Sequence, residues 1–284
     1  ETLELEISNV SGAARLGTDA AVQTIIDDDG PGSNLALKDT GLSYCATVDN
    51  TLLACPQAGF PLQDGEVGRD VTANDPDDGL EGFSFTKLDA DGAPIANQAA
   101  AYYFDYYGFP INSNYAIWDC VQDEVTGLTW EVKTDVPGDL RHYDWTFSWY
   151  NSSGVNDGGD AGAANAGNCT NSASCDTEAY VAAVNAANLC GFNDWRVPRQ
   201  EEIFTLAVTA SPSADALRGL DSNYFPHNYA TLGQVDRGFT YWSSTPDASD
   251  SGSAWALRFE SPDPNQFSTD KSSALRLRLV RGGL

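Results

Sequence analysis

The stretch CGFNDWRVP at residues 190–198 lies between two predicted helices and marks where one stops and the other starts. Upstream, Asp176 is a typical N-cap residue and Gly191 a typical helix end. Downstream, Pro198 favours a helix start, which predicts a second helix over residues 199–207. The apolar stripe of the first helix consists of Tyr180, Val181, Val184, Ala187 and Leu189. The stretch therefore predicts two short helices joined by a turn.

Strands dominate the prediction outside these helices. Residues 239–243, 253–259 and 274–280 are typical strand segments, and in the last of them leucines alternate with Arg276 and Arg278. Large aromatic residues beside small or apolar ones are expected to anchor the core, namely Trp130, Trp195, Trp242 and Trp255. Two short helices among many strands and loops predict an α+β fold.

Six cysteines predict three disulfides. They form an even set without a CxxC pair, and His142 and His227 are the only histidines, so a zinc site is disfavoured. Spacing favours two local bridges and one long-range bridge, while other pairings stay open. The expected pairs are Cys45 with Cys55, Cys169 with Cys175, and Cys120 with Cys190. Because disulfides persist in oxidising compartments, the protein is expected outside the cytoplasm.

The composition disfavours several classes of function. With 15 Lys and Arg against 41 Asp and Glu, the 284 residues carry a formal net charge of −26, and a field of this sign repels nucleic acids and other polyanions. No run reaches the roughly 18 uncharged apolar residues of a membrane span, so membrane insertion is not expected. The histidines lie in no recognisable motif and no thiol is spare, so we expect no enzymatic activity.

The second half of the chain carries seven short blocks in a fixed order. They are CVQD at 120–123, TGLTWEVK at 126–133, WYN at 149–151, CGFNDWRVP at 190–198, YWSS at 241–244, AWA at 254–256 and RLVR at 278–281. Through them the chain resembles the bacterial family typified by the C-terminal domain of the Lcl collagen-like adhesin, itself similar to C-type-lectin-like folds. The resemblance implies an extracellular, C-type-lectin-like adhesin domain that presents loops to a ligand.

One predicted loop resembles the calcium site of lectin-like folds. Such folds hold Ca²⁺ with side-chain oxygens around a proline-containing loop, and sugar hydroxyls complete its coordination. Asp263 and Asn265 flank Pro264 in this way, and Glu260 lies nearby in sequence. We expect these three polar residues at a ligand site, with a plain polar turn as the alternative.

An aromatic run, YYFDYYGF at residues 102–109, departs from the family pattern. As a strand it would carry tyrosine on both faces. One interpretation is a strand wedged between layers of the core. The other is a sugar-stacking platform that includes Tyr103 and Tyr107.

The N-terminal segment predicts two strands. Residues 2–7 alternate at period two, and residues 20–26 form a second strand-like run. Together they resemble the last two strands of a Calx-beta domain. That resemblance implies a role in Ca²⁺ binding for Asp27, Asp28 and Asp29, with an acidic linker as the alternative.

The Lcl adhesin domain is associated with sulfated glycosaminoglycans, which require a basic surface. Residues 116–284 carry 11 Lys and Arg against 22 Asp and Glu, a net charge of −11. Three arginines near the C-terminus are left as a candidate cationic strip, namely Arg276, Arg278 and Arg281. A neutral glycan or a surface protein therefore fits better as the ligand.

The arginine within the central stretch is expected to serve the fold. Arg196 lies close in sequence to Asp194 and Glu201, and either carboxylate would give it an internal ion pair. Such a pair is a structural role, so Arg196 is not expected to act as a catalyst.

These expectations divide the chain into terminal Calx-beta-like strands at 1–30, a β-rich connector at 31–115 and a lectin-like domain at 116–284. We expect a fragment of a secreted bacterial surface protein that binds a glycan or a protein as a non-enzymatic adhesin. The alternative is a structural subunit of a secreted filament, in which residues 1–26 add strands to the sheet of a neighbouring copy.

Overall fold

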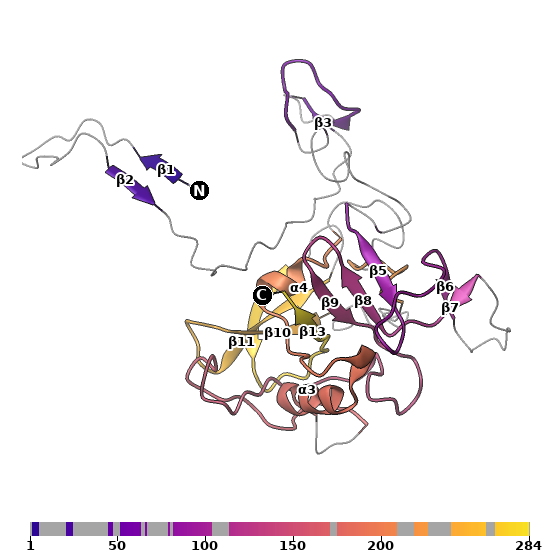
Figure 1. The fold of residues 1–284 in the computed structure, drawn as a ribbon. Coiled ribbons are helices and arrows are strands. Elements are labelled where there is room, and N and C mark those ends of the chain that lie inside the picture. The colour runs from indigo at the N-terminus through magenta and orange to yellow at the C-terminus, as the bar shows by residue number, and fades with distance from the viewer. Residues whose placement is uncertain are drawn as a thin grey trace, which may run out of the picture. The chain divides into compact units, whose positions relative to one another are not determined.

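The structure is a computed structural model. It describes residues 2–5, 21–24, 45–47, 52–63, 66, 79, 82–103, 114–170, 175–208, 219–226, 240–259 and 265–283. Contacts divide the chain into two compact units, one of Glu1–Asn34 with Gly283–Leu284 and one of Leu35–Gly282. Figure 1 shows the described elements of both.

The first unit contains the two predicted N-terminal strands. β1 (Thr2–Leu5) and β2 (Ala21–Thr24) pair in antiparallel orientation, and the other residues of the two predicted runs lie outside the described residues. The relation to Calx-beta domains stays a prediction. Asp27, Asp28 and Asp29 lie outside the described residues.

The second unit contains a four-stranded antiparallel sheet. Its strands, in spatial order, are β13 (Val280–Gly282), β9 (Leu128–Glu131), β8 (Cys120–Asp123) and β5 (Phe85–Leu88). Figure 1 shows β13, near the end of the chain, beside β9. The strand β5 comes from the predicted connector yet shares a sheet with the predicted lectin-like domain. The domain boundaries themselves stay predictions.

A second, three-stranded antiparallel sheet contains β10 (Thr240–Pro246), β11 (Ser253–Arg258) and β12 (Asn265–Asp270). The sequence prediction missed β12 because its run, NQFSTD, is polar apart from one phenylalanine. The strand predicted at 274–280 was also wrong in its extent. Residues 275 and 276 form isolated bridges, and the regular strand begins only at Val280.

Two small two-stranded sheets complete the strands. β3 (Cys45–Ala46) and β4 (Leu52–Leu53) are antiparallel, whereas β6 (Ala101–Tyr102) and β7 (Tyr115–Ala116) are parallel. Both sheets are short, and neither extends the two larger ones.

The first predicted helix is α3 (Thr177–Ala186). As expected, Asp176 is its N-cap, and the Asp176 side chain accepts a hydrogen bond from the Ala179 amide at 2.8 Å. The helix ends before Gly191, however, because Asn188 and Cys190 adopt left-handed backbone conformations with φ of 55° and 50°. These residues lead into a 3₁₀ turn, η2 (Leu189–Gly191).

The second predicted helix is α4 (Gln200–Phe204), with Arg199 as its N-cap. The Glu202 carboxylate accepts a hydrogen bond from the Arg199 amide at 2.7 Å, which stabilises the helix start. α4 packs against β10 and β11. No helix in the part of the chain that the structure describes is long and apolar enough to cross a membrane.

Strand β10 separates two hydrophobic cores. Tyr241 packs into a cluster with Trp118 and Trp130, whereas its neighbour Trp242 packs into a second cluster with Trp149 and Trp195. The two cores therefore lie on opposite faces of one strand. Of the four tryptophans predicted as anchors, Trp130, Trp195 and Trp242 are buried, and Trp255 is half-buried.

The three predicted disulfides are confirmed. Their connectivity is Cys45–Cys55, Cys120–Cys190 and Cys169–Cys175. The long-range bridge ties β8 to the turn that follows α3, so it links the four-stranded sheet to the helical layer. All six cysteines are bridged.

Candidate functional site

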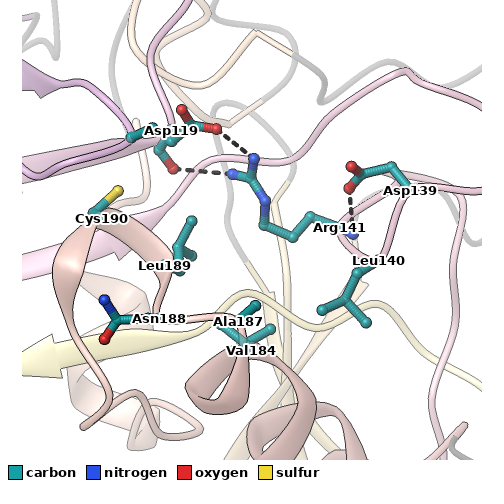
Figure 2. Close-up of a pocket in the computed structure, with 10 residues that line it drawn as sticks. Asp119, Asp139, Leu140, Arg141, Val184, Ala187, Asn188, Leu189 and Cys190 are labelled. Atoms are coloured by element: carbon teal, nitrogen blue, oxygen red, sulfur yellow. Dashed lines mark hydrogen bonds and ion pairs between the residues drawn. The ribbon is translucent and has the colours of Figure 1, made fainter.

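A pocket of about 260 Å³ lies between the C-terminal end of α3 and the loop at residues 139–141 (Figure 2). Its walls come from four separate parts of the second unit. The lining residues are Ala90, Asp119, Asp139, Leu140, Arg141, Val184, Ala187, Asn188, Leu189 and Cys190.

An ion pair forms the polar wall of this pocket. Arg141 Nη2 pairs with the Asp119 carboxylate, and Arg141 Nη1 donates to the backbone carbonyls of Val132 at 2.8 Å and Asp119 at 3.2 Å. The two side chains are only 14% and 18% exposed. Burial by itself lowers the pKa of Arg141, but the charges of Asp119 and Glu131 and the hydrogen bond to Asp119 together raise the pKa overall. None of the described residues accepts a hydrogen bond from Arg141 Nε.

The loop that carries Arg141 is held by its own aspartate. The Asp139 carboxylate accepts a hydrogen bond from the Arg141 amide at 2.7 Å, as Figure 2 shows. The Asp139 carbonyl accepts another from Trp145 Nε1 at 2.7 Å. These bonds fix the direction in which the Arg141 side chain leaves the loop, so the ion pair meets the pocket in one geometry.

The opposite wall is mostly apolar. Val184 is buried in α3, Ala187 follows the helix, and Leu189 is 9% exposed. The left-handed Asn188 lies between Ala187 and Leu189, and its side chain is exposed. Cys190 closes this wall through its disulfide to Cys120, the residue after Asp119. One disulfide thus joins both walls.

This arrangement offers binding groups and lacks the parts of a nucleophilic active site. Guanidinium donors, carboxylate acceptors and an exposed amide surround an apolar floor. The lining residues include no histidine, hydroxyl or free thiol, the groups that act as base or nucleophile in covalent catalysis.

Half of the cations in the described part of the chain are buried. Lys87, Lys133 and Lys271 are 2%, 4% and 2% exposed, and the fourth lysine, Lys38, lies outside the described residues. Arg276 and Arg278 are 9% and 1% exposed. The predicted cationic strip is therefore wrong.

The reason is that the segment carrying these arginines passes between the two cores. Arg278 lies over the rings of Phe225 and Tyr241 at 4.9 and 5.7 Å, while Leu277 and Leu279 pack into the other core. Both faces of the segment are buried, so alternation of leucine and arginine does not mark a solvent face here.

The predicted partner of Arg196 was also wrong. Arg196 makes a two-pronged ion pair with Glu202, with both distances at 2.7 Å, instead of pairing with Asp194 or Glu201. In the first turn of α4, Glu202 is fully buried and Glu201 is 55% exposed. Asp194 instead pairs with Arg281 at 2.7 Å, and this pair holds the pKa of Asp194 below its usual range.

The sequence-predicted ligand residues are only partly described. Asn265 is the exposed first residue of β12, opposite Arg258. Tyr103 is half-buried, and its amide donates to the Ala116 carbonyl at 2.8 Å. Asp263, Glu260 and Tyr107 lie outside the described residues. Within the described ranges, no three His, Cys, Asp or Glu side chains gather as metal ligands.

The sequence prediction missed the pocket. Asp119 and Arg141 are 22 residues apart, in no motif, and only the register of the folded sheet and loop brings them together. The sequence signals this ion pair only indirectly. Cations are few in so acidic a chain, and each arginine that is buried needs a carboxylate or carbonyl partner.

The fold is that of a disulfide-bonded α+β domain, and its three bridges fit an oxidising compartment outside the cytoplasm. Residues 119–281, more than half of the chain, match the Lcl C-terminal domain family. The chain belongs to this family, which confirms the resemblance found in the sequence. No curated protein and no solved structure matches the chain. Its C-type-lectin-like character stays a prediction.

Proposed function

We propose that the chain is a surface-associated, adhesin-like module without enzymatic activity, and that its pocket binds one neutral sugar residue of a glycan. Family membership supports the adhesin-like role. The observation that carries the ligand class is the charge balance of the pocket wall, where Arg141 and Asp119 neutralise each other. Such a wall gives an anion no net attraction, because Asp139, the other charged lining residue, is a carboxylate.

The hydrogen-bonding groups of the pocket match those of a sugar. Each sugar hydroxyl donates one hydrogen bond and accepts others, and the pocket offers both a guanidinium and two carboxylates beside an apolar floor. Pockets for drug-sized ligands occupy about 300–1,000 Å³, so a volume of about 260 Å³ suits a single ring.

Polyanionic glycans fit this protein poorly. The net charge of −26 repels them at long range. The described lysines are also buried, so their ammonium groups do not reach a sulfated chain at the surface. We therefore propose a neutral glycan, and a surface protein is the alternative outcome of the test.

The test is a glycan array probed with the whole chain and two matched variants. Ala187 lines the pocket, whereas its neighbour Ala186 does not, and both are exposed. We expect neutral glycans to bind, A187W to weaken binding about tenfold or more, and A186W to leave it unchanged. Equal binding by both variants would move the site elsewhere, and silence on neutral glycans would reject the ligand class.

Calcium is a separate proposal. A Ca²⁺ ion held by Glu260, Asp263 and Asn265 would make glycan binding depend on the ion. A second Ca²⁺ ion, held by Asp27, Asp28 and Asp29, would do the same if it positioned the binding domain. Repeating the array with a chelator separates the two sites, because the pocket contains its own donors and needs no metal. Binding that survives the chelator places the sugar in the pocket.

A second candidate function rests on β1 and β2. Each strand has four residues, and no third strand pairs with them among the described residues. An isolated two-stranded hairpin is marginally stable in water. We propose, as the alternative, that these strands complete the sheet of a neighbouring copy in a filament. Light scattering of the chain with and without residues 1–30 tests this, because a monomer in both cases contradicts it.

A further inference from the structure

A lysine side chain lies at the meeting point of two loops. Lys271 directly follows β12 and is 2% exposed. Its Nζ donates hydrogen bonds to three backbone carbonyls, those of Asp157 and Asp160 at 2.6 Å and that of Ser251 at 2.7 Å. The Trp149 ring lies 4.3 Å from the same nitrogen. All three protons of the ammonium group are therefore in use.

The three carbonyls belong to segments far apart in the chain. Two come from the loop at 151–160, and the third comes from the turn at 247–252 between β10 and β11. We call these two segments the loop face. The first segment also approaches the end of β10, where a Cβ added to Gly158 would lie 2.8 Å from Pro246 Cβ.

Each of the two segments is shaped by hydrogen bonds within itself, and these bonds do not connect one segment to the other. Asp157 accepts a hydrogen bond from the Gly159 amide at 2.9 Å, and Asp250 accepts one from the Gly252 amide at 3.0 Å. These bonds shape each turn internally. Lys271 Nζ is the atom that bonds both turns at once.

The surroundings of this nitrogen are those of a bound cation. Hard metal cations in proteins take backbone carbonyl and carboxylate oxygens as ligands. Here carbonyl oxygens contact the ammonium, and the charges of Asp160, Asp157 and Asp250 favour its protonated form against the effect of burial. The aromatic face of Trp149 adds a cation–π contact on another side.

We propose that Lys271 is a built-in cation that fixes the loop face, and that the loop face forms without a bound metal ion. The covalent link to β12 keeps the ammonium in place at any calcium concentration. The face that it holds exposes Val155, which is 63% exposed, among short polar side chains. This inference does not depend on the sugar pocket, since none of the pocket residues contacts Lys271.

Hydrogen exchange of the whole chain tests the proposal. The reporters are the amides of Gly159 and Gly252, one from each segment. In K271M we expect both to exchange about tenfold faster or more, because three carbonyls lose their common donor. The matched control is S272A at the exposed neighbouring residue, which should leave both amides unchanged. Faster exchange at only one reporter would overturn the joining role.

The wild-type chain is measured with and without a chelator. Unchanged protection supports the proposal, and loss of protection as large as that in K271M overturns it by showing that a metal holds the loops. This arm decides the question even if K271M does not fold. K271R is the second variant, because its planar guanidinium keeps the charge but cannot direct three converging bonds, and we expect intermediate exchange.

A chemical rescue separates charge from hydrogen bonding. K271A leaves space for a small amine, so ethylammonium should restore slow exchange at both reporters. Tetramethylammonium carries the same charge without any N–H donor and should not. Rescue by both ions, or by neither when K271A is folded, would overturn the role assigned to the three hydrogen bonds.

Discussion

Arg141 and Lys271 are both cations that contact backbone carbonyls, yet one lies in the wall of a pocket and the other in a closed cage. Arg141 has five N–H groups, and its partners in the described residues leave Nε without an acceptor. Lys271 has three, and three carbonyls take them all. A cation with donors to spare can recognise a ligand, whereas a cation without them can only hold the fold.

The largest expected effect comes from removing the bridge that joins the pocket walls. In the double variant C120A/C190A, we expect the free energy of unfolding to fall by about 2–5 kcal/mol, because the bridge closes a long loop. The pocket should lose its shape while the loop face keeps slow amide exchange, which chemical denaturation and hydrogen exchange measure. Equal loosening of both regions would show that they are not independent.

The next effect compares the two cations directly. K271M leaves three carbonyls in partly buried positions without their donor, and we expect a loss of stability of about 2–4 kcal/mol. R141M acts on a more exposed pair, so about 1–2 kcal/mol is expected. Urea denaturation of both variants gives the ranking. A greater loss in R141M would mean that the pocket, and not the cage, stabilises the fold.

Glycan binding should rank the same variants in the opposite order. R141M removes the donors of the pocket and should weaken binding of a neutral glycan about tenfold or more. K271M should leave that binding within about twofold, since Lys271 contacts no pocket residue. Isothermal titration with the array-selected glycan measures both. A strong loss in K271M would connect the loop face to the ligand.

The last prediction concerns Lys87, a third cation that contacts backbone carbonyls. Its Nζ donates to the carbonyls of Gln98 at 2.7 Å and Ala100 at 2.9 Å and lies over the ring of Trp118. Burial lowers the pKa of Lys87 from 10.5 to about 8. Between these two values the unfolded chain binds more protons than the folded chain, so stability should rise with pH there.

Urea denaturation from pH 8 to pH 10.5 checks this sign. The stability of the wild-type chain relative to K87M should grow as the pH rises, because only the wild type loses this buried charge. A constant difference across the range would show that Lys87 keeps its ordinary pKa in the folded protein.

Local chemistry made part of the fold predictable. Asp176 and Pro198 signal helix starts by their own side chains, and the spacing of the cysteines indicated their pairing, so these features were confirmed. The missed strand β12 is polar and pairs along one strand only, β11. The sequence of β12 does not alternate between apolar and polar residues, so it carries no recognisable strand pattern.

Features set by tertiary contacts were not predictable. Arg196 pairs with Glu202, whose carboxylate is buried. The burial of Glu202 results from packing, which the spacing of residues in the sequence does not show. The pocket likewise depends on where Asp119 meets Arg141 in the folded chain. The family could be predicted from the sequence, whereas the pocket depends on contacts that form only in the folded chain.

The burial of lysine has a practical consequence for how this protein meets its surroundings. Lys87, Lys133 and Lys271 are all at most 4% exposed, so amine-reactive dyes, aldehyde cross-linkers and proteases that cleave after lysine will not readily reach these three lysines in the folded protein. In the part of the chain that the structure describes, exposed carboxylates are therefore easier to reach than lysine amines. Chemical attachment to a surface or a probe should therefore be designed through its acids.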